Sequence, residues 1–133
     1  MKKRIAILAT NGFEESELKS PKEAMEKEGF QVDIVSLKKE KIKSWDVDDW
    51  GKEYDVDYAL QDVTAKDYNA LVLPGGVINP DQLRRHDDVL IFVRDFFKQS
   101  KPVAAICHAI QILTVANVLK GRTLTAYPTI GPE

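Results

Sequence analysis

The stretch Lys101-Pro102-Val103-Ala104-Ala105-Ile106-Cys107-His108 indicates how the chain folds and where its chemistry lies. An apolar run ends at Cys107, and a run with helical spacing follows over residues 108–116. This order is typical of a nucleophile elbow, in which a sharp turn between a strand and a helix exposes one side chain at the carboxyl end of the strand. The N–H groups that open the helix, and the positive end of its dipole, favour the thiolate form of such a cysteine. The segment alone leaves a second interpretation open, in which Cys107 is a small buried apolar side chain.

Outward from this segment, apolar runs with β-type residues alternate with amphipathic helical runs. This alternation predicts an α/β fold with a mostly parallel sheet and helices on both of its faces. We expect strands over residues 5–9, 31–36, 70–73, 103–106 and 123–126. We expect helices from Ser20-Pro21 to Glu28-Gly29, from Asp87 or Asp88 to Gln99, and directly after Cys107. Residues 38–67 are charged and irregular, which predicts a surface excursion with short strands whose Trp45 and Trp50 serve packing or an interface.

The composition restricts the class of protein. The chain has 133 residues, of which 44% are hydrophobic and 30% charged, and this suits one globular domain over residues 1–133. A net charge of −2 gives no reason to expect nucleic acid or an anionic membrane as a partner. One cysteine and two histidines make a poor zinc set, so we expect no metal. Because no apolar run approaches the ~20 residues of a membrane span, and the apolar start is too short for a signal peptide, we expect a cytoplasmic protein.

Three segments with chemical potential each follow a predicted strand. Glu14-Glu15 follow the first strand, Gly75-Gly76 follow the third, and Cys107-His108 follow the fourth. Ligands of doubly wound sheets bind outside the carboxyl ends of the strands, so we expect these segments to meet there. Glycines let backbone N–H groups approach a ligand closely, which makes Gly75 and Gly76 candidate oxyanion donors. Together with a thiolate and a proton-transfer group, they would form a site for attack on a carbonyl.

These residues resemble the PfpI family, whose superfamily also holds the Parkinson-associated protein deglycase and the class I glutamine amidotransferase domains. Four segments carry the resemblance in the order of the family, and it spans essentially the whole chain. They are Asn-Gly-Phe-Glu-Glu at 11–15, Ala-Leu-Val-Leu-Pro-Gly-Gly at 70–76, Lys-Pro-Val-Ala-Ala-Ile-Cys-His at 101–108 and Leu-Lys-Gly-Arg at 119–122. The resemblance implies a flavodoxin-like three-layer sandwich.

The resemblance also implies a set of site residues. Cys107 is the nucleophile, His108 is its neighbour, and Glu14, directly after the phenylalanine of the first motif, is the carboxylate. A protonated Glu14 would donate a hydrogen bond to the sulfur and stabilise the thiolate, whereas an ionised one would disfavour it. His108 either accepts the thiol proton or only flanks the elbow, where its backbone N–H would join those of Gly75 and Gly76 as an oxyanion donor. Glu15 is expected to be a solvated charge or the N-terminal residue of a helix.

The chain departs from the family pattern in two places. Gly-Pro or Ala-Pro usually follows the Cys-His pair, whereas this chain has Ala109-Ile110 and lacks the proline that presets a helix start. The sequence also stops at residue 133, before several further elements of the family pattern. We therefore expect a PfpI-like domain that is truncated at its C-terminal end. His86, in a polar run, is expected to be a structural surface residue.

For function, the resemblance implies attack of the Cys107 thiolate on an electrophilic carbon. We expect a stress-protective enzyme of the glyoxalase or deglycase type, acting without a cofactor on a small aldehyde or on glycated protein. An intracellular cysteine peptidase acting on peptides is the alternative within the same class. A redox sensor oxidised at Cys107, working through partners rather than turnover, is the alternative from another class. The resemblance further implies a homo-oligomer, a dimer or larger, and the sequence around Trp45 and Trp50 hints at the interface.

Overall fold

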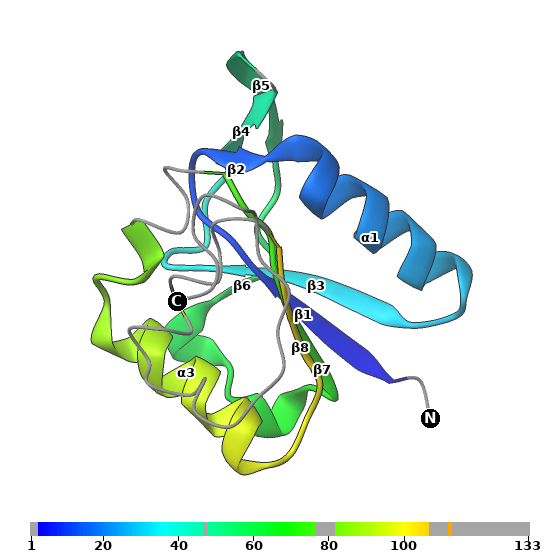
Figure 1. Ribbon diagram of the computed structural model, residues 1–133, viewed down its shortest axis with the longest axis vertical. Coiled ribbons are helices and arrows are strands. Elements are labelled where there is room, and N and C mark those ends of the chain that lie inside the picture. The colour runs from blue at the N-terminus through cyan, green and yellow to red at the C-terminus, as the bar shows by residue number, and fades with distance from the viewer. Residues whose placement is uncertain (1–2, 47, 77–81, 107–111, 113–133) are drawn as a thin grey trace, which may run out of the picture.

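A five-stranded parallel sheet forms the centre of the computed structural model, which describes residues 3–46, 48–76, 82–106 and 112 (Figure 1). The strand order is β6-β3-β1-β7-β8, and every neighbouring pair is parallel. The strands are β1 (Arg4–Leu8), β3 (Gln31–Ser36), β6 (Tyr58–Ala59), β7 (Ala70–Leu73) and β8 (Val103–Ala105). Parallel strands need long crossover connections, and helices supply two of them.

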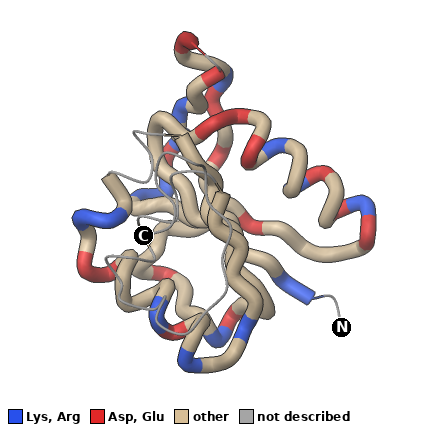
Figure 2. Tube along the Cα trace, in the orientation of Figure 1, with Lys and Arg blue, Asp and Glu red and all other residues tan. Residues whose placement is uncertain are grey.

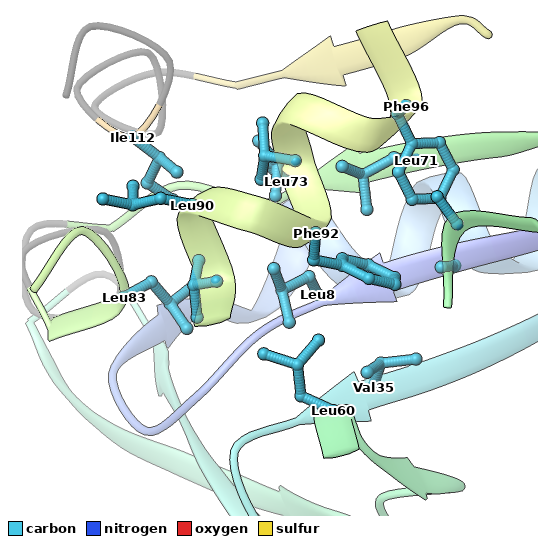
Figure 3. Packing of buried hydrophobic residues seen from close by; sticks show 14 of the residues in the cluster. Leu8, Val35, Leu60, Leu71, Leu73, Leu83, Leu90, Phe92, Phe96 and Ile112 are labelled. Carbon is cyan, nitrogen blue, oxygen red and sulfur yellow. The ribbon is translucent and has the colours of Figure 1, made fainter. Parts of the chain in front are cut away.

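Helix α1 (Glu15–Lys27) covers one face of this sheet and α3 (Asp87–Lys98) covers the other (Figure 1). Successive side chains of a strand point to opposite faces, and β1 divides accordingly. Ile5 and Ile7 join the apolar cluster that holds Leu18 of α1. Ala6 and Leu8 join the other cluster, in which Phe92 and Phe96 of α3 lie against the sheet (Figure 3). The predicted three-layer, flavodoxin-like α/β fold is confirmed.

The predicted strand boundaries agree with the structure to within one or two residues. Residues 31–36 and 70–73 are strands as predicted, and β1 starts and ends one residue earlier than expected. Strand β8 ends at Ala105, and its side chains are half-buried or exposed because it is the edge strand of the described sheet. The predicted strand over 123–126 and the predicted helix after Cys107 lie outside the described residues, as does the question of a truncated C-terminal end.

The predicted start of the first helix was wrong. Helix α1 begins at Glu15 rather than at Ser20-Pro21, and Pro21 lies inside it. A proline within a helix removes one backbone hydrogen bond, which usually costs about 3 kcal/mol. Two features favour the earlier start: Leu18 is fully buried against the sheet, and Glu15 and Glu17 place negative charge in the first turn, where the helix dipole is positive.

The predicted end of α1 is confirmed. Gly29 adopts a φ of +93°, which favours glycine. The N–H of Gly29 donates to the carbonyl of Glu26 at 3.0 Å, and that of Phe30 donates to Met25 at 3.1 Å. This pair of hydrogen bonds is a Schellman motif, which satisfies the last carbonyls of the helix and turns the chain into β3.

The surface excursion predicted over residues 38–67 is only partly confirmed: residues 42–54 form a β-hairpin that projects from the body of the molecule (Figure 1). The later part was wrong, because β6 joins the central sheet and Leu60 and Ala65 are buried in the core. Strands β4 (Ile42–Asp46) and β5 (Asp49–Tyr54) are antiparallel, and the short strand β2 (Phe13–Glu14) pairs with β4 to complete a three-stranded sheet. The rings of Trp45 and Trp50 meet edge to face, with centroids 5.2 Å apart. Trp50 is 44% exposed. Two 3₁₀ turns, η1 (Leu60–Asp62) and η2 (Ala65–Asp67), lead on to β7.

Candidate active site

The order of the central strands places the candidate site between the ends of β1 and β7. The chain passes from β1 to β3 on one side and later enters β7 on the other side of β1. At such a reversal of strand order, the connections leave in opposite directions and open a crevice where ligands of this fold class bind. The segments that leave β1 and β7 here contain Glu14 and Gly75-Gly76, as the sequence predicts.

Two hydrogen bonds join these segments. The N–H of Glu14 donates to the carbonyl of Gly75 at 3.2 Å. In the other direction, the N–H of Gly75 donates to Oε1 of Glu17 at 2.7 Å. The prediction that Glu14 and the glycine pair meet at the carboxyl edge of the sheet is therefore correct, and Glu17 joins them.

Gly76 is fixed by a close approach of backbone to backbone. Its φ is +93°, and a Cβ at this position would lie 2.5 Å from the carbonyl oxygen of Gly12 and 3.1 Å from the nitrogen of Glu14. A real Cβ cannot occupy that space, and the backbone conformation also disfavours any other residue. The two glycines therefore hold the loop after β7 against the loop after β1.

Glu17 is the residue that the sequence interpretation missed. It lies in the first turn of α1, three residues after Glu14. A short bond from a backbone N–H to a carboxylate is charge-assisted, and the positive end of the helix dipole adds to it. The bond to Gly75 is a long-range contact, so no local sequence signal indicated it. The predicted role of Glu14 as the site carboxylate stays a prediction.

The first motif is held in place by the hairpin. Phe13 is fully buried, and its ring meets that of Tyr54 edge to face at 5.4 Å. The side-chain oxygen of Asn11 accepts a hydrogen bond from the N–H of Lys43 at 2.8 Å, and the N–H of Gly12 donates to the Lys43 carbonyl at 2.9 Å. Asn11, Gly12 and Phe13 therefore each have a contact that fixes their position. Glu14 follows them directly in the chain, at the edge of the sheet.

Glu15 is the first residue of α1, which agrees with one of the two predictions for it. It is half-buried and lies on the hairpin side. Burial, and next the nearby carboxylate of Glu15, raise the pKa of Tyr54 to about 12. Glu15 thus belongs to the contact between α1 and the hairpin.

The described chain brings Ile106, the residue before the predicted elbow, to the same edge. The N–H of Ile106 donates to the carbonyl of Leu73 at 3.0 Å, and Ile106 packs against the apolar cluster that contains Phe13. Ile106 therefore lies beside Leu73, the last residue of β7. Leu73 is two residues before Gly75. The next residues, Cys107 and His108, lie outside the described residues, so their predicted roles and the oxyanion role of His108 stay predictions.

The oxyanion role predicted for Gly75 and Gly76 stays a prediction. In the structure, the N–H of Gly75 donates to the carboxylate of Glu17.

Over the ranges that the structure describes, no group of three or more His, Cys, Asp or Glu side chains is arranged to hold a metal ion. His86 is exposed and precedes α3 at its N-cap position, where its carbonyl accepts the N–H of Leu90. In the same described part, no helix has the length and apolar character needed to cross a membrane.

Comparison with known proteins identifies the family. A family model described as DJ-1/PfpI family matches residues 3–133. The chain belongs to the DJ-1/PfpI family. The resemblance found in the sequence is thereby confirmed, and the match covers the β1, β7 and elbow segments that form the candidate site.

Two DJ-1/PfpI relatives carry enzyme names. The chain is 39% identical over 130 residues to "Protein/nucleic acid deglycase 2" of Escherichia coli, and the match covers 98% of this chain and 74% of that protein. It is 39% identical over 130 residues to "Putative cysteine protease YraA" of Bacillus subtilis, covering 98% of this chain and 75% of the relative. The names of these relatives fit a hydrolase-type enzyme.

A solved DJ-1/PfpI structure has the same fold. The crystal structure of Drosophila melanogaster DJ-1beta superimposes with a TM-score of 0.88 at 28% sequence identity. The superposition covers 99% of this chain and 69% of that chain. The parallel sheet and its covering helices are therefore those of the family.

Proposed function

We propose that the chain is a cysteine-dependent enzyme that acts on small reactive carbonyl compounds or on glycated protein, with Cys107 as the nucleophile. The observation that carries the proposal is the delivery of Ile106 to the end of β7, beside the loop where Gly75 holds the carboxylate of Glu17. The residue that follows is the single cysteine of the chain. The deglycase name of a relative at 39% identity supports this substrate class.

The chemistry needs only protons and water besides the thiolate. With methylglyoxal, Sγ of Cys107 adds to the aldehyde carbon, and the carbonyl oxygen takes a proton to give a hemithioacetal. A proton then moves from the former aldehyde carbon to the ketone carbon through an enediol, which leaves a thioester. Water hydrolyses the thioester to lactate and frees the thiol. No step requires an external oxidant or a cofactor.

Glu17 is the carboxylate that we assign to these proton transfers, in addition to the Glu14 that the family resemblance implies. Its Oε1 accepts the N–H of Gly75, which fixes the carboxylate beside the loop after β7, and a positioned carboxylate is a suitable acid or base. Glu14 contributes its backbone N–H to the same loop. Parallel Glu14→Gln and Glu17→Gln variants separate the two assignments, because each keeps the size of the side chain and removes its acid–base function.

The deciding experiment is methylglyoxal consumption with lactate detection for the chain and for Cys107→Ala. We expect turnover that Cys107→Ala abolishes while circular dichroism and thermal unfolding stay as in the parent chain. His86→Ala is the matched control, because His86 is an exposed residue that precedes α3 and has no assigned part in the site. Unchanged turnover in Cys107→Ala would sink the proposal.

The same variants test the peptidase alternative, which the name of the Bacillus relative favours. Hydrolysis of an unstructured protein or fluorogenic peptide that depends on Cys107, without lactate formation, would assign the site to peptide substrates. Selective addition of two oxygens to Cys107 by mild peroxide, a gain of about 32 Da, without turnover of either substrate would assign it to redox sensing.

The hairpin supports self-association, the further property that the resemblance implies. Within the described residues, β5 pairs only with β4, so its outer edge is open. Trp50 is exposed on this hairpin and rests against Trp45, which lies in register with Glu14. An open strand edge with aromatic side chains is a typical interface. We expect a dimer or larger assembly in sedimentation experiments, and a shift toward the monomer in Trp50→Lys.

The location that we assign to this chemistry is the cytoplasm. The chain has a single cysteine, and a catalytic thiol is kept reduced in that compartment. Fractionation of cells that produce the tagged protein would test the assignment, and recovery in an oxidising compartment would contradict it.

A further inference from the structure

A groove of about 240 Å³ lies on the α3 face of the molecule, and the described residues that line it are not those of the candidate active site. One wall is the middle of α3, and the other is the segment around η1. The apolar side chains that line it are Leu60, Val63, Ile91 and Phe92. Leu60 and Phe92 belong to the buried cluster around Leu8, so the floor of the groove is the rigid core itself (Figure 3).

Ile91 gives this groove an open apolar edge. The side chain is 55% exposed, more than Trp50 or Tyr58, the other large hydrophobic residues exposed in the described part of the chain. The neighbouring positions Leu90 and Phe92 are buried, which places Ile91 just outside the buried stripe of α3. A single exposed isoleucine is unremarkable on its own, but here it extends an apolar floor to the surface.

The charged residues that line the groove are all acidic. Asp88 and Asp95 lie on α3 one turn before and one turn after Ile91, so the three share a face of the helix. Seven residues of helix separate the two carboxylates by about 10 Å along the axis. Figure 2 shows acidic positions at the start and in the middle of α3.

A second groove, of about 350 Å³ between α1 and β5, differs in this respect. It is lined by three lysines, Lys19, Lys22 and Lys52, together with four acidic residues. Lys22 already pairs with Glu26 at 3.0 Å. Because its charges compensate one another, that groove has no preference for one sign, whereas the α3 groove combines an apolar floor with a negative rim.

We infer that the α3 groove is a docking site for a short segment of a partner protein that carries two basic side chains about 10 Å apart with an aliphatic side chain between them. The aliphatic side chain would lie on Ile91, Phe92 and Leu60. The two cationic groups would meet Asp88 and Asp95, with their methylene stems along the apolar wall. The described residues that line the groove differ from those of the candidate active site, so docking and turnover are tested by separate variants.

The test uses a fluorescein-labelled peptide with two arginines three residues apart and a leucine between them, titrated into the full chain by fluorescence anisotropy. An extended segment of this spacing separates the two arginines by about 10 Å. We expect saturable binding that weakens with salt, because both rim contacts are exposed ion pairs. A peptide with glutamates in place of the arginines should not bind.

Variants on the groove decide the site. We expect Ile91→Ser and the double variant Asp88→Asn, Asp95→Asn each to weaken binding about tenfold, equivalent to about 1.4 kcal/mol. Glu23→Gln, in the α1 groove, is the matched control and should bind as the parent chain does. Cys107→Ala should also bind normally, which separates this inference from the proposed catalysis. Thermal unfolding of each variant checks that the fold is retained.

Three outcomes would overturn the inference. They are an absence of peptide binding, binding that Ile91→Ser leaves unchanged, and binding that Glu23→Gln weakens as much as the α3 variants do. A dimer of the chain that dissociates in Ile91→Ser, without peptide binding, would assign the groove to a second copy instead.

Discussion

Both ends of the central sheet hold carboxylates, but these carboxylates have different kinds of hydrogen-bond partner. At the amino end, Asp33 is nearly fully buried and is surrounded by side chains. Its Oδ2 lies 2.7 Å from Nη2 of Arg4 and accepts the hydroxyl of Tyr68 at 3.0 Å, while Oδ1 accepts the amide of Gln31 at 3.3 Å. The guanidinium of Arg4 also lies 4.8 Å from the centre of the Tyr68 ring. This carboxylate is neutralised by a full cation and has no oxygen without a partner.

At the carboxyl end, Oε1 of Glu17 accepts a hydrogen bond from a backbone N–H, that of Gly75. Such a bond fixes the position of a carboxylate without neutralising its charge. One fold therefore uses carboxylates for two different purposes. Side-chain partners at the amino end fasten β1, β3 and the start of β7 to one another, and the backbone N–H of Gly75 at the carboxyl end positions the carboxylate of Glu17.

The largest effect that we expect is on turnover at the carboxyl end. Glu17→Ala should lower the proposed turnover of methylglyoxal by about 1,000-fold, because a positioned acid or base contributes about 10²–10⁴ to a rate. The measurement is lactate formation per folded protein, with folding checked by thermal unfolding. If Glu17→Ala keeps its turnover while Glu14→Gln loses it, the assignment of the proton-transfer carboxylate returns to Glu14.

The counterpart at the amino end should change stability and leave chemistry alone. Asp33→Ala removes the only carboxylate that Arg4 pairs with in the described structure and the acceptor of the Tyr68 hydroxyl, and we expect a loss of about 3 kcal/mol in the free energy of unfolding. Urea unfolding measures it. Turnover per folded molecule should be unchanged, and a large loss of turnover in the folded variant would contradict the separation of the two ends.

A pair of glycine variants compares two positions that have the same φ but different surroundings. Gly76→Ala and Gly29→Ala both place a side chain at a φ of +93°, but only the first would meet backbone, since nothing lies within 4 Å of a Cβ at Gly29. We expect a loss of about 1 kcal/mol in unfolding free energy for Gly29→Ala from the backbone conformation alone. For Gly76→Ala we expect at least about 2 kcal/mol, together with lower turnover. Equal losses at both positions would show that the contact with Gly12 gives way easily.

The smallest expected effect is a change of stability in alkali. Burial, and then the carboxylate of Asp33, hold the pKa of Tyr68 well above the usual 10.0. As the pH rises past 10 the unfolded chain therefore loses this proton first, so the contribution of Tyr68 to the free energy of unfolding is constant below that pH and falls above it by up to about 1.4 kcal/mol per pH unit. Urea unfolding at pH 8 and pH 11 measures the fall. Tyr68→Phe should reduce the fall.

The sheet was predictable from sequence because parallel strands buried on both faces appear as short apolar runs. Residues 31–36 and 70–73 show this, and both match the observed strands. The start of α1 was not predictable in the same way. Ser20-Pro21 is a strong local signal for a helix start, but the burial of Leu18 against the sheet is a long-range gain that no local pattern displays.

The candidate site, like the fold, could be predicted only in part. The meeting of Glu14 with Gly75 and Gly76 followed from strand order, because each segment comes directly after a strand of one parallel sheet. The part of Glu17 depends on a hydrogen bond between residues 58 positions apart in the chain, and only the folded backbone shows it. Cys107 and His108 remain predictions from the elbow pattern and the family.

The two hydrogen bonds of Gly75 determine how the loops after β1 and β7 open. Its carbonyl is bound to the N–H of Glu14 and its N–H to the side chain of Glu17, so the loops after β1 and β7 separate only if both bonds break together. Opening of this edge is then one cooperative event, and the Gly75 amide should exchange with deuterium as slowly as the strands beside it. The carboxylate is in position before a substrate arrives, and no ordering step has to follow the encounter.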